Sequence, residues 1–138
     1  MAALMRLDDY LADAQRKPWA WGRMDCTLFA GDWVRAATGI DPCVWRGTYS
    51  NAYQARRLLA RHGGFMAMVE REMSRCGFAR IDAPEHGDVA IIEAPGTQPE
   101  HAVAGMAAVI VTPPWLLARA PDGIVGLQAE IVAAWRVK

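Results

Sequence analysis

Apolar residues recur every three or four positions near the start of the chain, as they do along one face of an amphipathic helix. This spacing predicts a first helix that ends at about Gln15 and carries the apolar stripe Leu4, Leu7, Tyr10 and Leu11. Lys17 and Pro18 then break the pattern, because proline disfavours a helical conformation at the residue before it. We expect a loop over residues 19–24.

A second helix is expected over residues 26–38, with apolar bulk from Leu28, Phe29, Trp33 and Val34. Asp25 directly precedes this helix and is a favourable N-cap, because its carboxylate can accept hydrogen bonds from the unpaired N–H groups of the first turn. Gly39 follows the helix and should close it in a left-handed conformation.

Two further helices are expected before the pattern changes. Ser50 can cap a third helix that runs to Arg61 and is ended by the glycine pair 63–64. A fourth helix should run from about Phe65 to Arg75 and stop at Gly77. The first half of the chain is therefore predicted to be mainly helical.

Short apolar and β-branched runs replace the helical spacing in the second half of the chain. They predict strands over residues 89–92, 102–111 and 124–127, and a last piece that ends near Val137. The pairs Pro113-Pro114 and Asp122-Gly123 are turn signals. Because helices come first and strands second, we predict one α+β domain over residues 1–138, with N-terminal helices packed on a small antiparallel sheet.

The composition is that of a globular protein, since 53% of the 138 residues are hydrophobic and 22% are charged. Lys and Arg together number 15, as do Asp and Glu, and no basic run is present, so we expect no nucleic-acid partner. Acidic residues at 8, 9 and 13 interrupt the N-terminal apolar stretch, so we expect no signal peptide. No apolar run approaches the roughly 20 residues of a membrane span.

The three cysteines, Cys26, Cys43 and Cys76, lack the spacing of a metal site and cannot form a complete disulfide framework. We expect reduced thiols and neither a metal nor another cofactor. Cys26 is the strongest candidate for chemistry, because a thiol in the first turn of a helix lies at the positive end of the helix dipole, which should lower its pKa and favour the nucleophilic thiolate. The alternative is a small buried apolar residue, as most free cysteines are. Cys43 and Cys76 are expected to be structural.

The segment around Cys26 resembles the signature of the NlpC-type cell-wall peptidases. Residues 17–29 read Lys-Pro-Trp-Ala-Trp-Gly-Arg-Met-Asp-Cys-Thr-Leu-Phe, which is similar to the Pro-aromatic pair, glycine turn and Asp-Cys-Ser helix start of that family. Residues 86–92, His-Gly-Asp-Val-Ala-Ile-Ile, resemble the family's Gly-Asp-hydrophobic strand. His101 follows at the distance at which the family has its catalytic histidine.

The resemblance implies a papain-like (NlpC-type) fold and cysteine-peptidase chemistry. Cys26 would attack an amide carbonyl in a peptidoglycan stem peptide, and His101 would pair with the thiolate and protonate the leaving amine. Backbone N–H groups at the helix start would stabilise the oxyanion. Thr112 is the nearest polar residue that could orient His101, where the family usually has His, Asn, Gln or Glu. The residues assigned to substrate binding are Trp19, Trp21 and Asp25.

A second resemblance is to small proteins of phage and prophage tail modules. It rests on the Trp-Gly-Arg-x-Asp-Cys helix start, the Gly-Asp-Val strand, Pro121-Asp122-Gly123 and residues 134–137. Together the two resemblances imply synthesis in the cytoplasm of a bacterial host, then a place in the virion tail, with peptidoglycan peptides and tail-tip proteins as partners. Three functions stay open: a tail-associated peptidoglycan peptidase, an inactive structural or assembly protein of the tail tip, and a cysteine-dependent acyltransferase or deamidase.

Overall fold

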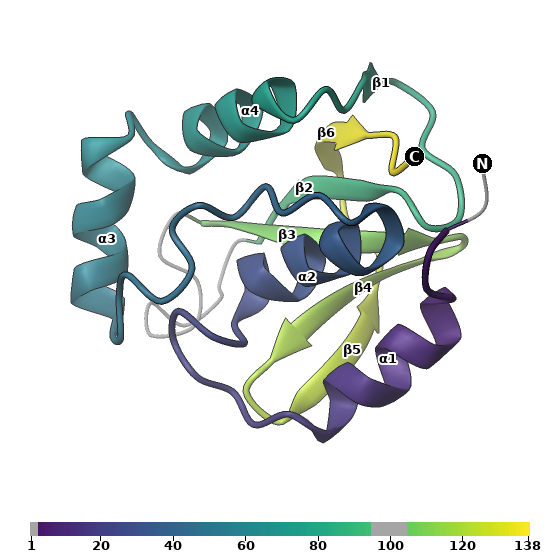
Figure 1. The fold of residues 1–138 in the computed structure, drawn as a ribbon, viewed down its shortest axis with the longest axis horizontal. Helices are drawn as coiled ribbons and strands as arrows, with labels where there is room; N and C mark the ends of the chain where they lie inside the picture. Colours follow the sequence, from purple (N-terminus) through teal and green to yellow (C-terminus); the bar gives the residue numbers. More distant parts are fainter. Residues whose placement is uncertain (1–2, 95–104) are drawn as a thin grey trace.

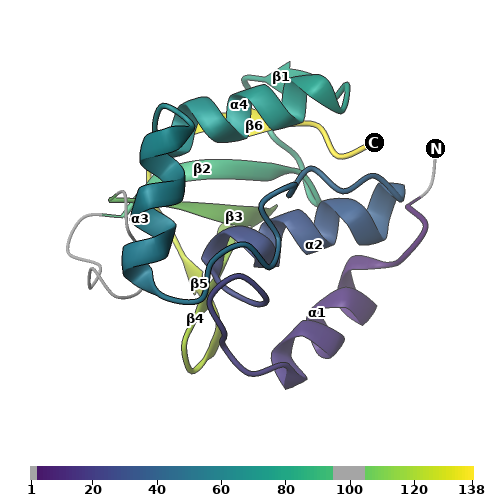
Figure 2. The same ribbon diagram turned by 60° about the vertical axis from the view of Figure 1, so that its left-hand side comes forward.

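Four helices precede six strands in the residues that the computed structural model describes, 3–94 and 105–138 (Figure 1). The helices are α1 (Leu7–Arg16), α2 (Cys26–Thr38), α3 (Ala52–Arg61) and α4 (Phe65–Arg75). The strands are β1 (Arg80–Ile81), β2 (Val89–Glu93), β3 (Met106–Thr112), β4 (Trp115–Ala120), β5 (Gly123–Leu127) and β6 (Ile131–Trp135). They form one antiparallel sheet in the order β1-β6-β2-β3-β4-β5, with α2 lying on β3 and β4 (Figure 2). The predicted α+β class is confirmed.

Both ends of α2 are formed by the residues that the sequence predicts. The Oδ1 atom of Asp25 accepts a hydrogen bond from the backbone N–H of Leu28 at 2.9 Å, so Asp25 is the N-cap. At the other end Gly39 has φ +79°, and its N–H donates to the carbonyl of Arg35 at 2.8 Å. The left-handed conformation expected of Gly39 is therefore confirmed.

The starts of two other helices differ from their predicted positions. Asn51, and not Ser50, caps α3: its side chain accepts a hydrogen bond from the N–H of Gln54 at 2.8 Å. Ser50 lies one residue too early and donates to the Gln54 side chain instead. Helix α1 begins at Leu7, because the N–H of Leu4 donates to a carbonyl in the last turn of α2. In the described part of the chain, no helix has the length and apolar character that crossing a membrane would require.

The sequence pattern does not predict β1 or β4. Strand β4 reads Trp-Leu-Leu-Ala-Arg-Ala, and its leucines and alanines favour a helix when they are considered in isolation. Pairing with β3 on one side and β5 on the other overrides that preference. The strand predicted over 102–111 corresponds to β3, which begins at Met106; residues 102–104 lie outside the described part of the chain.

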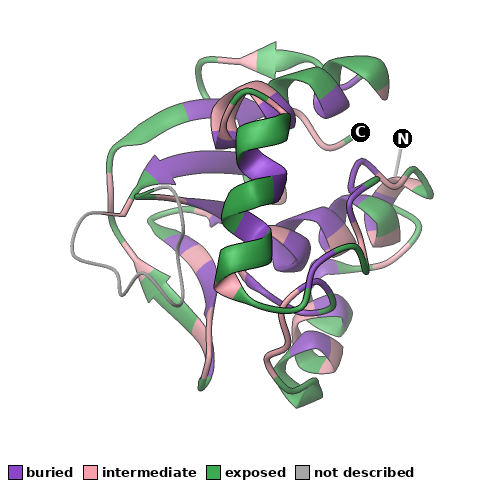
Figure 3. Ribbon diagram, turned by 90° about the vertical axis from the view of Figure 1, so that its left-hand side faces the viewer, coloured by how far each residue is buried: buried purple, intermediate pink, exposed green. Residues whose placement is uncertain are grey.

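The central strands β2 and β3 are buried on both faces of the sheet, whereas the outer strands are partly exposed (Figure 3). On the face toward the helices, Val89, Ile91 and Ile110 belong to the same core as residues of α1, α2, α3 and α4. On the other face, strand residues form a second buried cluster: Ala90, Ile92, Ala107, Val109, Val111, Leu116, Ala118 and Ala134. Half of this cluster is alanine. Strands β4 and β5 run at a steep angle to β2 (Figure 1).

A buried arginine joins β4 to the first helix. The guanidinium of Arg119 donates hydrogen bonds to the carbonyls of Ala14 at 3.1 Å, Lys17 at 2.8 Å and Ala120 at 2.9 Å. Ala14 and Lys17 lie at the C-terminal end of α1, where the helix dipole favours a positive charge. Arg119 therefore holds the end of α1 against the sheet.

Candidate active site

The loop before α2 is a tight turn held against residues 45–49. Gly22 at its tip has φ +77°, and its N–H donates to Oδ2 of Asp25 at 3.0 Å. The carbonyl of Gly22 accepts a hydrogen bond from the N–H of Gly47 at 2.9 Å. A Cβ atom on residue 22 would lie 2.1 Å from the carbonyl oxygen of Tyr49, so the close approach of the two segments requires glycine.

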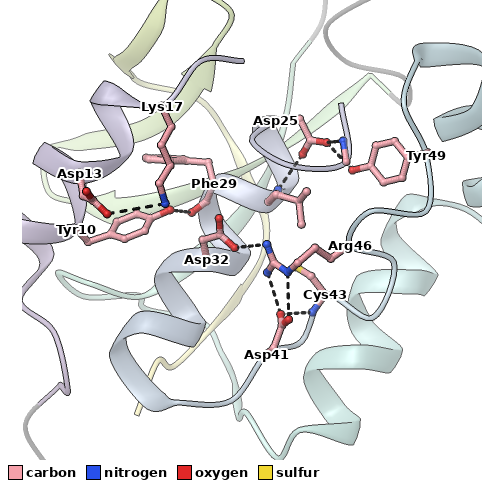
Figure 4. Close-up of polar contacts among 12 residues, drawn as sticks. Tyr10, Asp13, Lys17, Asp25, Phe29, Asp32, Asp41, Cys43, Arg46 and Tyr49 are labelled. Atoms are coloured by element: carbon pink, nitrogen blue, oxygen red, sulfur yellow. Dashed lines mark hydrogen bonds and ion pairs between the residues drawn. The ribbon is translucent and has the colours of Figure 1, made fainter. Parts of the chain in front are cut away.

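Asp25 connects this loop to α2 (Figure 4). Its side chain is buried; Oδ1 accepts from Leu28, while Oδ2 accepts from Gly22 and from the hydroxyl of Tyr49. Burial, followed by the negative charge of Asp25, raises the pKa of the Tyr49 phenol, which therefore stays a proton donor. A buried carboxylate that already accepts three hydrogen bonds holds the start of α2 and offers no surface to a substrate. This geometry does not support the assignment of Asp25 to substrate binding.

A second polar cluster fixes residues 41–46 to α2 (Figure 4). The guanidinium of Arg46 forms an ion pair with Asp32 of α2 and two hydrogen bonds to Asp41, at 3.1 and 3.2 Å. Asp41 also accepts a hydrogen bond from the N–H of Cys43 at 2.9 Å. Burial raises the pKa of Asp32 and outweighs the opposite effect of Arg46. The cluster places the buried Cys43 side chain against α2, in agreement with its expected structural role.

Cys26 lies at the end of the sheet where β2 stops and β3 begins. It is the first residue of α2 and is partly exposed, and its Sγ atom is 3.8 Å from Oγ1 of Thr27. Two hollows meet at this residue. One is small and reaches Met106 and α3, and the other runs along the second face of the sheet and contains Ala107. The thiol is thus placed between a helix N-terminus and a concave surface, as a nucleophile would be.

The surroundings of Cys26 raise its pKa from an ordinary value of 9.0 to about 12. Desolvation by the surrounding protein is the largest cause, and the negative charge of Asp25 is the second. Hydrogen bonds from Thr27 and from the backbone of Cys26 lower the pKa, as expected at a helix start, but by less. The prediction of a lowered thiol pKa is therefore wrong, because the cost of burying a thiolate exceeds the benefit of the helix terminus.

Alkylation of Cys26 should therefore accelerate with pH far beyond the range of an ordinary thiol. In a Cys43→Ala/Cys76→Ala variant, Cys26 is the sole thiol, and its reaction with iodoacetamide can be followed by intact mass. We expect the rate to rise without a plateau up to at least about pH 10, because only the thiolate reacts. The same variant unfolded in urea should titrate at the ordinary thiol pKa of 9.0.

A plateau below neutral pH in the folded protein would contradict the raised pKa and support the value predicted from sequence. The shift also affects folding, because the folded thiol holds its proton more tightly than the unfolded one. Its contribution to stability is complete below the unfolded pKa of 9.0 and is lost as the pH rises toward the folded pKa of about 12.

The two other predicted catalytic residues are not joined to Cys26 by the described structure. His101 lies outside the described residues. Thr112 lies at the opposite end of β3 from Ala107, which shares a hollow with Cys26; five residues of extended strand span roughly 17 Å. Its hydroxyl donates to the carbonyl of Trp115 at 3.2 Å, in the turn between β3 and β4. The assignment of Thr112 as the residue that orients His101 is therefore not supported, because the strand carries it away from the Cys26 end of the sheet.

Trp19 and Trp21 lie together on the loop before Cys26. Their ring centroids are 5.7 Å apart in an edge-on arrangement, and the ring of Trp21 also contacts that of Tyr49 at 6.4 Å. Both tryptophans are partly exposed, and Trp21 lines the small hollow that contains Cys26. Trp21 is thus brought to the candidate site, and Trp19 contacts it without lining the hollow.

The larger hollow beside Cys26, which we name the apolar hollow, was not foreseen from sequence. Its volume is about 410 Å³. The described residues that line it are Cys26, Ile92, Glu93, Ala94, Ala107, Ala118, Arg119, Ala120, Pro121, Val125, Leu127, Gln128 and Ala129. One sequence signal could have indicated it: apolar residues stand at every second position at 125, 127 and 129, and residue 118 is apolar as well. Because the hairpin pairs Ala118 with Val125, these side chains lie on one face of the sheet.

Comparison with known proteins identifies one family. A family model described as a domain of unknown function (DUF6950) matches residues 4–137. Neither a curated protein nor a solved structure matches the chain. Among the described residues, no group of three or more His, Cys, Asp or Glu side chains is arranged to hold a metal ion.

Proposed function

This chain belongs to the DUF6950 family, and we propose that it is a cysteine-dependent hydrolase of amide bonds with an NlpC-type, papain-like fold. The observation that carries the proposal is the placement of Cys26. It is the first residue of a helix whose start is locked by the buried Asp25, and it opens on the apolar hollow. The order of the Asp-Cys helix start, the Gly-Asp strand and His101 along the chain supports the same proposal.

The raised pKa of Cys26 determines which mechanism fits. At neutral pH the thiol is protonated, so its proton must leave as the sulfur attacks the carbonyl carbon. We assign this general-base role to His101, which would then pass the proton to the leaving amine. An acyl-enzyme on Cys26 would result, and water would hydrolyse it. In this mechanism the proton leaves the thiol during the attack, whereas in the mechanism expected from the resemblance Cys26 is already a thiolate paired with His101.

The N–H groups of Cys26 and Thr27 are the proposed oxyanion donors. Asp25 occupies the next two N–H groups of the helix, since its side chain accepts from Leu28 and its carbonyl accepts from Phe29. The first two lie at the start of α2, beside the thiol. A carbonyl oxygen under attack by Sγ would develop its negative charge close to these donors.

We propose peptidoglycan stem peptides as the substrate and a phage or prophage tail as the setting. Both follow from the two sequence resemblances. A domain carried by a virion would reach the cell wall through assembly into the tail, after synthesis in the cytoplasm of the bacterial host. Tail-tip proteins would then be its protein partners.

A second candidate is a structural protein of the tail tip that retains the fold without the activity. Two observations favour it. The thiol pKa of about 12 disfavours the nucleophilic form, and Thr112, the sequence-predicted orienting residue, lies at the wrong end of β3. On this alternative Cys26 is a packed thiol at a helix start.

Digestion of purified peptidoglycan separates the two candidates. The wild-type protein should release peptide fragments that mass spectrometry identifies. Cys26→Ala and His101→Ala should release none, because each removes a group that takes part in bond cleavage. Cys76→Ala, at the end of α4, is the matched control and should keep full activity. The hydrolase proposal fails if wild type and Cys26→Ala give identical digests.

A further inference from the structure

The apolar hollow has the lining of a pocket for aliphatic groups. Nine of the thirteen described residues around it are Ala, Val, Ile, Leu or Pro, and the other four are Cys26, Glu93, Arg119 and Gln128. The guanidinium of Arg119 is already engaged with the end of α1, so among the described lining residues Glu93 is the remaining charged group. An anionic ligand group placed here would lose hydration beside Glu93 without gaining a partner of opposite sign, whereas an aliphatic side chain would bury apolar surface.

Strand β5 forms one side of the hollow and is also an edge of the sheet. Of the described strands, β4 is the one that pairs with it, and its register places Val125 and Leu127 on the face that lines the hollow. The tight hairpin pairs Ala120 with Gly123, so backbone groups of alternate residues, Ile124 and Gly126, point to the open side of the sheet. The N–H of Ile124 donates to the side chain of Gln15, so the next outward-facing backbone position, Gly126, is where we expect another strand to pair.

The described structure gives no internal reason for glycine at position 126. Its φ is not in the left-handed region. An added Cβ would meet only Leu117 and Trp115, at ordinary contact distances of 3.8 to 4.0 Å. Glycine inside a strand is less stable than alanine, and it is found where another backbone approaches closely.

We infer that an extended peptide pairs with β5 at Gly126 and places a small aliphatic side chain in the apolar hollow, next to Cys26. This inference rests on the proposed function and names the substrate class of the same site. Main-chain pairing would supply affinity, and the alternation of side chains along the peptide would direct every second one into the hollow.

Peptidyl chloromethyl ketones test the inference directly. Cys26 Sγ displaces chloride from the methylene carbon, so a C–S bond forms, the C–Cl bond breaks, and the thiol proton goes to the buffer. In the Cys43→Ala/Cys76→Ala background, acetyl-Val-Val-Ala and acetyl-Asp-Asp-Ala chloromethyl ketones would be compared at about pH 9. We expect the aliphatic probe to alkylate Cys26 at least about tenfold faster. N-methylation of its amides should remove most of that advantage.

Matched variants locate the effect. Val125→Asp puts a charge at the rim of the hollow and should abolish the aliphatic preference. Val44→Asp changes a valine that is 56% exposed and lies outside the hollow, and it should leave the preference intact. Equal rates for the two probes, no alkylation by either while iodoacetamide still reacts, or a preference that survives Val125→Asp would each overturn the inference.

Failure of this inference can be told apart from failure of the proposed function, because alkylation needs no turnover. Selective labelling without release of peptidoglycan fragments would keep the peptide site and reject the hydrolase. Fragment release together with equal probe rates would keep the hydrolase and reject this site.

Discussion

Replacement of Gly22 by alanine should lower the free energy of unfolding by about 3 kcal/mol or more. Two costs add at this position. The backbone has φ +77°, which residues with a Cβ rarely adopt, and the new Cβ would lie 2.1 Å from the carbonyl oxygen of Tyr49. The neighbour is backbone, so it cannot rotate away. The loop would have to separate from residues 45–49, and the Tyr49 hydroxyl would then lose its partner Asp25.

Gly47→Ala is the matched control. Its φ of +74° is close to that of Gly22, but an added Cβ meets nothing within 4 Å. It should cost only about 1 kcal/mol, from the backbone conformation alone. Urea denaturation followed by circular dichroism measures both variants. Equal losses would mean that the close contact with Tyr49 does not contribute.

Asp25→Ala should destabilise the protein by about 4 kcal/mol, since it removes an N-cap and leaves buried donors unsatisfied. The N–H groups of Gly22 and Leu28 and the hydroxyl of Tyr49 would all lose their acceptor. The variant should also lower the pKa of Cys26, because the charge of Asp25 is the second cause of its increase. Alkylation of the single-thiol variant measures that second effect.

The control for Asp25→Ala is the removal of a solvent-exposed N-cap, Asn51. Asn51 caps α3 through one hydrogen bond to the N–H of Gln54, and it is exposed to solvent. Asn51→Ala should therefore cost only about 1 kcal/mol, because water can satisfy the freed N–H. If the two substitutions cost the same, burial of the Asp25 network would not be the reason for its strength.

The sequence predicted those features correctly that depend only on a residue and its neighbours along the chain. Asp25 before a helix and Gly39 after it act through neighbouring backbone groups, so both ends of α2 could be predicted. It failed where distant residues decide. Strand β4 has a helical composition and becomes a strand only because β3 and β5 pair with it. The same limit applies to the second face of the sheet, whose burial depends on strand order.

The candidate site shows the same division. The position of Cys26 at a helix start followed from local pattern, and so did the backbone hydrogen bonds that lower its pKa. The desolvation that dominates depends on the packing of the whole fold around the thiol, which the local pattern does not contain. The position of Thr112 relative to Cys26 depends on where β3 begins. Because β3 starts at Met106, near Cys26, Thr112 lies at the far end of this strand.

The hydrogen bonds from Arg119 to the end of α1 determine when this helix can be stabilised during synthesis on the ribosome. Its hydrogen bonds to Ala14 and Lys17 join residues 105 and 102 positions apart. The helix is therefore made long before the arginine that secures its end emerges from the exit tunnel. An isolated helix of 10 residues is only marginally stable in water. We therefore expect α1 to be only partly folded during most of translation. We expect the end of α1 to dock against the sheet in one of the last folding steps, after the β4–β5 hairpin has formed.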